Sequence, residues 1–167
     1  MKMITLCLSA LLITITSFAI NGKDVDGFRD IKWGTTLDDI KNQRSVIDAD
    51  EDFDDMNAYV FVDENYNIGT VTMDAIYYTF NEDNKFYKVT CMGARDQMPD
   101  MLFILKNKFG EPNTKADMDT GKFREWTMDQ VKFQLNNDYN SEYFTLTIIS
   151  DWAKMEKFKI NSSVSDF

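Results

Sequence analysis

The stretch from residue 76 to residue 112 constrains the fold most, because it joins a strand hairpin to a clearly delimited helix. Residues 76–80 and 86–92 are rich in aromatic and β-branched side chains, which favour strands. The polar residues 81–84 between them are turn formers, so the stretch predicts an antiparallel hairpin. Strict alternation in the second run places Val89 and Cys91 on one face and Phe86 on the other.

A helix is predicted over residues 96–110. Asp96 can accept hydrogen bonds from the first-turn amides, and Pro99 tolerates a first-turn position because it lacks an N–H. Gly110 suits a left-handed position at the helix end, and Pro112 prevents continuation. One apolar stripe follows three- and four-residue steps, made of Met98, Met101, Leu102, Leu105 and Phe109. The favoured interpretation is core packing against the sheet, and the alternative is a groove for an apolar ligand.

The N-terminus has the pattern of a secretory signal peptide. Lys2 is followed by the uncharged, mainly apolar run 4–20, and Ser17-Phe18-Ala19 is the expected site, with small side chains at Ser17 and Ala19 for cleavage after Ala19. We therefore expect a signal peptide over 1–19, one domain over 20–160 and a flexible tail over 161–167. The predicted location is periplasmic or secreted, without membrane insertion after cleavage; an uncleaved anchor is the alternative.

The chain is strongly acidic, with 28 Asp and Glu against 18 Lys and Arg and a net charge of −10. An acidic surface disfavours nucleic acid and anionic lipid, since both bind basic patches. Cleavage would leave Cys91 as the one cysteine, and its position in a predicted central strand indicates a buried thiol. An intermolecular disulfide is the alternative.

The beginning of the predicted domain combines a short strand with a helix. Residues 28–34 predict the strand and its turn, and Thr35 and Thr36 each precede an aspartate by three residues, as in a capping box. Trp33 is interpreted as the plug between this strand and helix, with an exposed partner anchor as the alternative.

Further strands are predicted after each helix, while residues 111–121 are expected to form a polar connection and Asp151 to cap a short last helix. Runs of strands with helices between them predict an α+β fold. We expect an antiparallel sheet with two main helices packed on one face. The order also suggests two halves, each a helix followed by about three strands.

Spaced residues across the chain resemble a group of small exported bacterial proteins, most without an assigned function. The opening pattern is F-x-x-I-x-W-G-[ST], beginning at Phe28, and the helix end is K-[FY]-G-x-P, beginning at Lys108. The helix-then-sheet order is also similar to the folds of beta-lactamase inhibitor proteins and of small accessory lipoproteins of outer-membrane assembly. The matching residues are turn, cap and core positions, so the resemblance implies a fold and a location rather than an activity.

The residue types for several chemistries are missing. The sequence contains no histidine, which excludes Ser-His-Asp and Cys-His systems and His-ligated metals. Two aspartate-rich frames fail the calcium-loop pattern: the frame from Asp48 has Phe53 where glycine is required, and the frame from Asp63 has Gly69 one place late. We therefore predict no catalytic residue, no cofactor and no metal site, and the chain is not expected to be an enzyme.

The predicted function is a non-catalytic domain that binds a protein partner in the periplasm or cell envelope. The solvent-facing side of the sheet is the expected surface, and the candidate contacts are Trp33, Tyr77, Tyr139 and Tyr143. One alternative is a carrier that holds a small apolar ligand between the helix and the sheet. The other is a carboxylate-based hydrolase, in which two acids would face each other in a cleft.

Overall fold

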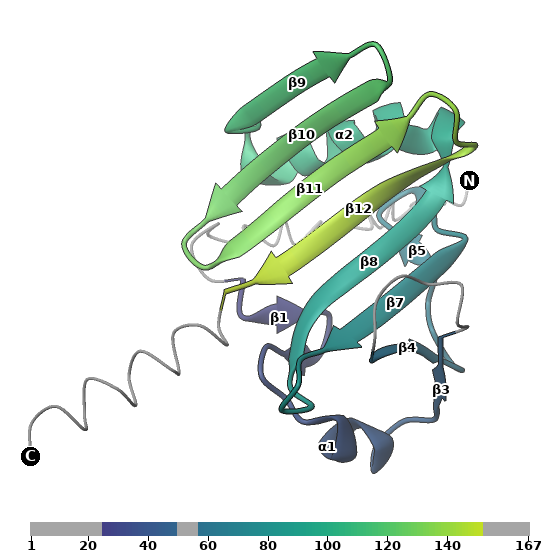
Figure 1. Cartoon of the computed structure of the whole chain (residues 1–167), viewed down its shortest axis with the longest axis vertical. Coiled ribbons are helices and arrows are strands. Elements are labelled where there is room, and N and C mark those ends of the chain that lie inside the picture. The colour runs from purple at the N-terminus through teal and green to yellow at the C-terminus, as the bar shows by residue number, and fades with distance from the viewer. Residues whose placement is uncertain (1–24, 50–56, 152–167) are drawn as a thin grey trace, which may run out of the picture.

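The computed structural model describes residues 25–49 and 57–151, and an eight-stranded antiparallel sheet dominates them (Figure 1). The strand order is β3-β4-β7-β8-β12-β11-β10-β9. The strands are β3 (Val46–Asp48), β4 (Ala58–Phe61), β7 (Ala75–Phe80), β8 (Phe86–Ala94), β9 (Thr114–Met118), β10 (Gly121–Met128), β11 (Val131–Asp138) and β12 (Tyr143–Ser150). The predicted α+β class holds in this coarse form, with strands predominating.

The sheet consists of two four-strand meanders that meet at β8 and β12. Helix α1 (Leu37–Lys41) precedes the first meander and helix α2 (Met98–Phe109) precedes the second. Leu146 pairs with Cys91 and Ile148 with Val89 across the antiparallel junction. Each half is therefore a helix followed by four main-sheet strands, one more than the sequence suggested.

The predicted face with two main helices is not present among the described residues. Helix α1 has only five residues, whereas α2 has twelve. In the first half, the core side of the sheet is packed instead by the hairpin β1 (Gly27–Phe28) and β2 (Ile31–Lys32), by α1, and by the hairpin β5 (Asn67–Ile68) and β6 (Val71–Thr72). Trp33 follows β2 and stacks on Phe86, with ring centroids 4.8 Å apart.

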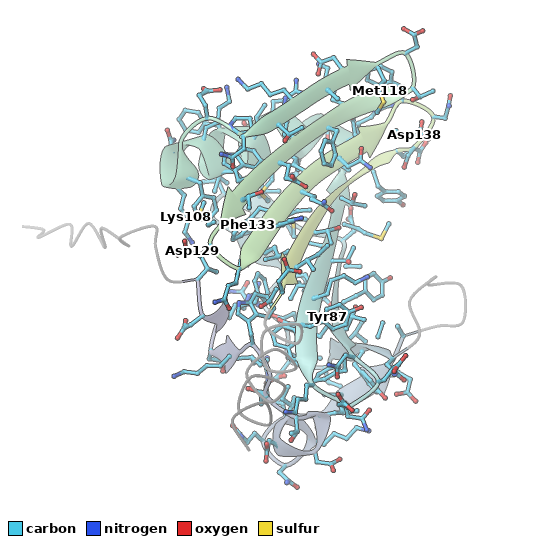
Figure 2. The ribbon with its side chains drawn as sticks, turned by 60° about the vertical axis from the view of Figure 1, so that its left-hand side comes forward. Tyr87, Lys108, Met118, Asp129, Phe133 and Asp138 are labelled. Atoms are coloured by element: carbon cyan, nitrogen blue, oxygen red, sulfur yellow. The ribbon has the colours of Figure 1, made fainter. Side chains whose placement is uncertain are left out.

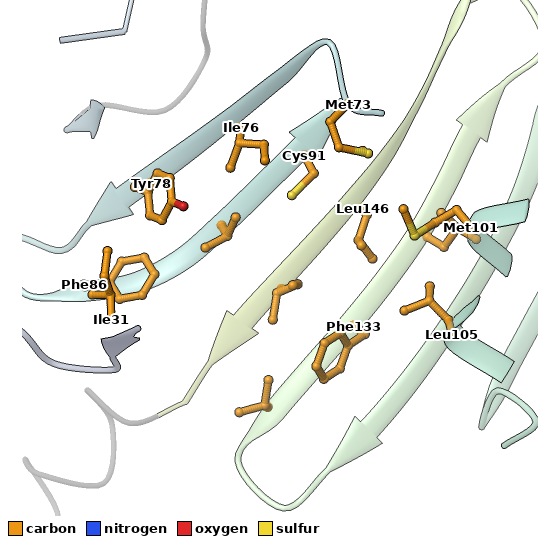
Figure 3. Packing of buried hydrophobic residues seen from close by; sticks show 14 of the residues in the cluster. Ile31, Met73, Ile76, Tyr78, Phe86, Cys91, Met101, Leu105, Phe133 and Leu146 are labelled. Carbon is orange, nitrogen blue, oxygen red and sulfur yellow. The ribbon is translucent and has the colours of Figure 1, made fainter. Parts of the chain in front are cut away.

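Helix α2 is fixed to the second half of the sheet by buried apolar side chains and one polar contact. Met101 and Leu105 lie toward Phe133 and Leu146 of the sheet (Figure 3). At the helix end, the indole nitrogen of Trp126 donates a hydrogen bond of 2.8 Å to the carbonyl oxygen of Gly110. The apolar stripe of α2 therefore packs against the sheet as part of the core.

The ends of α2 differ partly from the prediction. Asp96 lies in a 3₁₀ turn, η1 (Arg95–Gln97), and Gln97 precedes the helix without a side-chain capping bond. Pro99 is in the first turn as expected. Gly110 has a φ of 79° and a ψ of −161°, a positive-φ conformation that is open mainly to glycine. In α1, Thr36 is the N-cap of the two predicted candidates, Thr35 and Thr36, and it accepts a hydrogen bond from the amide of Asp39.

Two strand predictions are wrong for local reasons. Phe86 lies on the same side as Val89, because a register irregularity pairs Phe80 with Phe86 and interrupts the alternation. Residues 114–118, expected to be a loop, form the edge strand β9. Four of these five residues are exposed, so β9 has no apolar alternation and is defined by its pairing with β10.

The predicted signal peptide, the helix expected after Asp151 and the tail fall outside the described residues. So does most of the acidic run that begins at Asp48. Within the described ranges, none of the helices has the length and apolar content needed to cross a membrane.

Candidate functional site

One face of the main sheet has no described helix or strand packed over it, whereas α2 lies on the other side (Figure 1). We define the open face by three cross-strand rows taken from the pairing register. The rows are Ala116-Phe123-Asn136-Thr145-Met92-Ala75, then Thr114-Glu125-Gln134-Thr147-Thr90-Tyr77, then Thr127-Lys132-Ile149-Lys88-Thr79-Ala58.

The open face is poor in charge for so acidic a chain. Its three rows contain one acid, Glu125, and two bases, Lys88 and Lys132. The Glu125 carboxylate accepts a 2.8 Å hydrogen bond from the side-chain amide of Gln134. Threonine, alanine and partly buried Phe123 occupy much of the remainder. Ala58, Thr79 and Thr90 are buried, so the accessible part of the open face consists of the other positions of the three rows. The scarcity of charged side chains lowers the cost of desolvating this face, as expected of the centre of an interface.

Trp33 is not available to a partner. Its side chain is 7% exposed, and the indole nitrogen donates a 3.0 Å hydrogen bond to the carbonyl oxygen of Val25. Burial agrees with the interpretation of Trp33 as the plug between strand and helix and contradicts its alternative role as a partner contact, because the ring closes the core between β2, α1 and Phe86.

The three predicted tyrosines do not form one cluster. Tyr77 is a partly buried residue of the open face in β7. Tyr139 and Tyr143 lie on either side of the β11–β12 turn, and each is 43% exposed. The structure thus places two of the four candidate residues together at one end of the sheet.

A buried carboxylate missed by the sequence reasoning lies in the first half. The Glu64 side chain is 1% exposed and forms ion pairs with Arg29 and, at 4.0 Å, Arg44. The Tyr78 hydroxyl donates a 2.6 Å hydrogen bond to the same carboxylate. The available signal was arginine itself, because its guanidinium suits buried ion pairs better than the ammonium of lysine.

Aromatic rings surround this ion pair. The rings of Phe61 and Tyr78 stack with centroids 4.0 Å apart, and Phe28 meets Tyr78 edge-on at 5.9 Å. The guanidinium carbon of Arg44 lies 4.4 Å from the Phe61 centroid, within the range of a cation–π contact. Burial raises the pKa of Tyr78 well above its ordinary value, although the nearby Arg29 acts in the opposite direction.

A polar cleft of about 640 Å³ opens above the ion pair. It is lined by Arg29, Asp30, Gln43, Arg44, Asp63, Glu64, Asn65 and Asn67. Two arginines and a tyrosine hydroxyl stabilise the ionised form of Glu64, which opposes its use as a general acid. Asp30 and Asp63 are exposed partners of Arg44, at 3.7 and 3.3 Å. This arrangement fits an ion-pair network better than the acid pair of a hydrolase.

The second aspartate-rich frame is used for turn formation and ion pairing. The side-chain oxygen of Asn65 accepts a hydrogen bond from the backbone amide of Asn67. The side-chain oxygen of Asn67 in turn accepts one from the hydroxyl of Thr72. Asp63 pairs with Arg44. In the described parts of the chain, no group of three or more acidic, cysteine or histidine side chains is placed to hold a metal ion.

The interface between α2 and the sheet is filled by side chains. Met101 and Leu135 are fully buried, and Leu105 and Leu146 are 4% and 1% exposed. The rings of Phe109 and Phe133 lie 4.5 Å apart. Close packing of this kind favours a structural role for the stripe over an apolar ligand site.

The comparisons with known proteins add no relative: no protein-family model, no curated protein and no solved structure matches this chain.

Proposed function

We propose that the chain is an exported, non-catalytic domain that binds a protein partner of the periplasm or cell envelope through the open face. The observation that carries the proposal is the contrast between the open face and the rest of the chain. Its three rows contain a single acid, whereas the whole sequence has 28. Scarcity of charged residues, together with the aromatic and methionine side chains of Phe123, Tyr77 and Met92, is the composition found at the centre of protein interfaces.

The sequence supports the location and the absence of catalysis. The pattern of residues 1–19 is that of a signal peptide. Histidine is absent, and the buried Glu64 is held in an ion-pair network. The similarity in element order to inhibitor and assembly-accessory proteins is consistent with a binding role.

Site-specific photocrosslinking in the cells that produce the protein tests the proposal. A benzoylphenylalanine residue is placed at Phe123 or Thr147 on the open face, and at Phe103 or Asn107 on the exposed side of α2 as matched controls. We expect one discrete protein adduct from the open-face positions and none from α2.

Adducts of equal yield from all four positions would contradict a specific face, and so would their absence from both open-face positions. Fractionation of the adduct would also identify the compartment. An adduct that forms only with cytoplasmic proteins would contradict export.

A further inference from the structure

Three large side chains are exposed at one end of the open face. Met118 is 53% exposed, and Tyr139 and Tyr143 are each 43% exposed. Gly121 pairs with Met118 on one side and with Asp138 on the other, so the residues belong to neighbouring strands. Figure 2 shows Met118 and Asp138 at this end and Asp129 at the opposite end. We call Met118, Tyr139 and Tyr143 the corner.

The corner is held in place by hydrogen bonds between segments distant in sequence. The amide of Tyr139 donates a hydrogen bond of 2.8 Å to the carbonyl oxygen of Thr120. This bond joins the β11–β12 turn to the β9–β10 turn. The guanidinium of Arg95 donates a hydrogen bond of 2.7 Å to the carbonyl oxygen of Tyr139. The backbone amide of Arg95 donates another, of 2.8 Å, to the carbonyl oxygen of Glu142. A surface that is already ordered loses little entropy on binding.

The charge around the corner is mainly negative. Asp119 and Glu142 lie in the same two turns, Asp138 is the last residue of β11, and all three are exposed. Residues 118–121 and 138–143 contain no lysine or arginine. Arg95 is the nearby base, and its guanidinium is directed to a backbone carbonyl. Three carboxylates outnumber this one guanidinium, and aromatic rings beside an excess of carboxylates complement a cation that carries an apolar stem.

We propose that the corner binds a lysine- or arginine-bearing segment of the protein partner. The cation would lie over the faces of Tyr139 and Tyr143 as a cation–π contact, with the carboxylates of Asp138 and Glu142 beside it. Met118 adds an adaptable apolar contact for the aliphatic stem. This proposal rests on the proposed function, since it names the chemistry of the partner at one end of the open face.

A synthetic peptide of alternating arginine and glycine serves as the probe, and a glutamate–glycine peptide of the same length is its control. Binding is followed by two-dimensional NMR of the full chain. We expect the cationic peptide to shift the tyrosine ring signals of the corner and the methyl signal of Met118. Replacement of both Tyr139 and Tyr143 by alanine should weaken binding about tenfold, as loss of two exposed cation–π contacts implies.

The matched control is Tyr66→Ala, because Tyr66 is exposed to a similar degree, 38%, and lies outside the corner. It should leave the affinity unchanged. Because the whole chain is acidic, non-specific attraction is the competing explanation. Shifts spread over all acidic surfaces, or equal weakening by Tyr66→Ala, would overturn the proposal.

The two proposals can fail separately. Crosslinks from Phe123 and Thr147 without any peptide shift at the corner would leave the open-face function standing and remove the cationic partner segment. Peptide binding at the corner without any open-face crosslink would leave the cationic ligand of the corner standing and would contradict the open-face function. An adduct whose yield falls with Tyr139→Ala, Tyr143→Ala and with rising salt would support both.

Discussion

The hydroxyl of Tyr78 donates a 2.6 Å hydrogen bond to Oε2 of Glu64, and both side chains are removed from solvent. Tyr78 belongs to β7, whereas Glu64 lies in the segment after β4. The same carboxylate pairs with Arg29 of the β1–β2 turn and with Arg44 before β3. One buried charge therefore ties four separate segments of the first half together.

Removal of that charge should destabilise the fold. We expect Glu64→Gln to lower the free energy of unfolding by about 3 kcal/mol, the lower end for a broken buried pair, because both arginines retain some solvent contact. Urea denaturation measures this loss. The matched control is Asp63→Asn, which removes an exposed partner of Arg44 and should change stability by less than about 1 kcal/mol. Equal losses for the two variants would argue against a structural role for the Glu64 network.

Alkaline pH should destabilise the protein through Tyr78. Burial raises the pKa of Tyr78 in the folded chain, so the unfolded chain ionises first as the pH rises. The contribution of neutral Tyr78 to the stability of the folded chain is fully present below the ordinary tyrosine pKa of 10.0 and decreases above it. One pH unit above this ordinary value, the free energy of unfolding should have fallen by about 1.4 kcal/mol more than that of the Tyr78→Phe variant. Denaturant titrations of both proteins across this pH range provide the measurement, and parallel pH profiles would disprove the expectation.

The thiol of Cys91 should be inert in the folded protein. Cys91 is 0% exposed, and burial raises its pKa to about 12. Only thiolate reacts with a disulfide reagent. In a Cys7→Ser background, we expect no reaction at neutral pH until denaturant is added, whereas an added cysteine at exposed Thr114 reacts at once. Rapid modification of Cys91 without denaturant would mean that the central strands open locally.

The two sides of α2 should respond differently to truncation. Met101→Ala removes a fully buried side chain at the sheet and should cost about 2–5 kcal/mol of stability. Phe103→Ala on the same helix removes a side chain that is 66% exposed, and should change stability by at most about 0.5 kcal/mol. Thermal or urea unfolding distinguishes them. A large loss with Phe103→Ala would indicate that this ring is covered.

Sequence reasoning was most successful where the determining interactions are local. The hairpin within residues 76–92, the cap at Thr36 and the positive φ of Gly110 each depend on residues a few positions apart. It failed at Phe86, where one extra residue in the pairing reversed the face. It also failed at β9, whose polar residues become a strand only because β10 supplies the hydrogen bonds.

The residues of the candidate site also differ in whether local sequence could predict them. The exposure of Tyr139 and Tyr143 could be anticipated, because polar turn residues surround them. The burial of Glu64 could not, since its arginine partners are 35 and 20 positions away in the chain. The sequence by itself determined the turns, the helix caps and the alternation of most strands. Only the tertiary structure decided the strand order, the open face and the buried ion pair, because hydrogen bonds and charges between distant segments carry no local pattern.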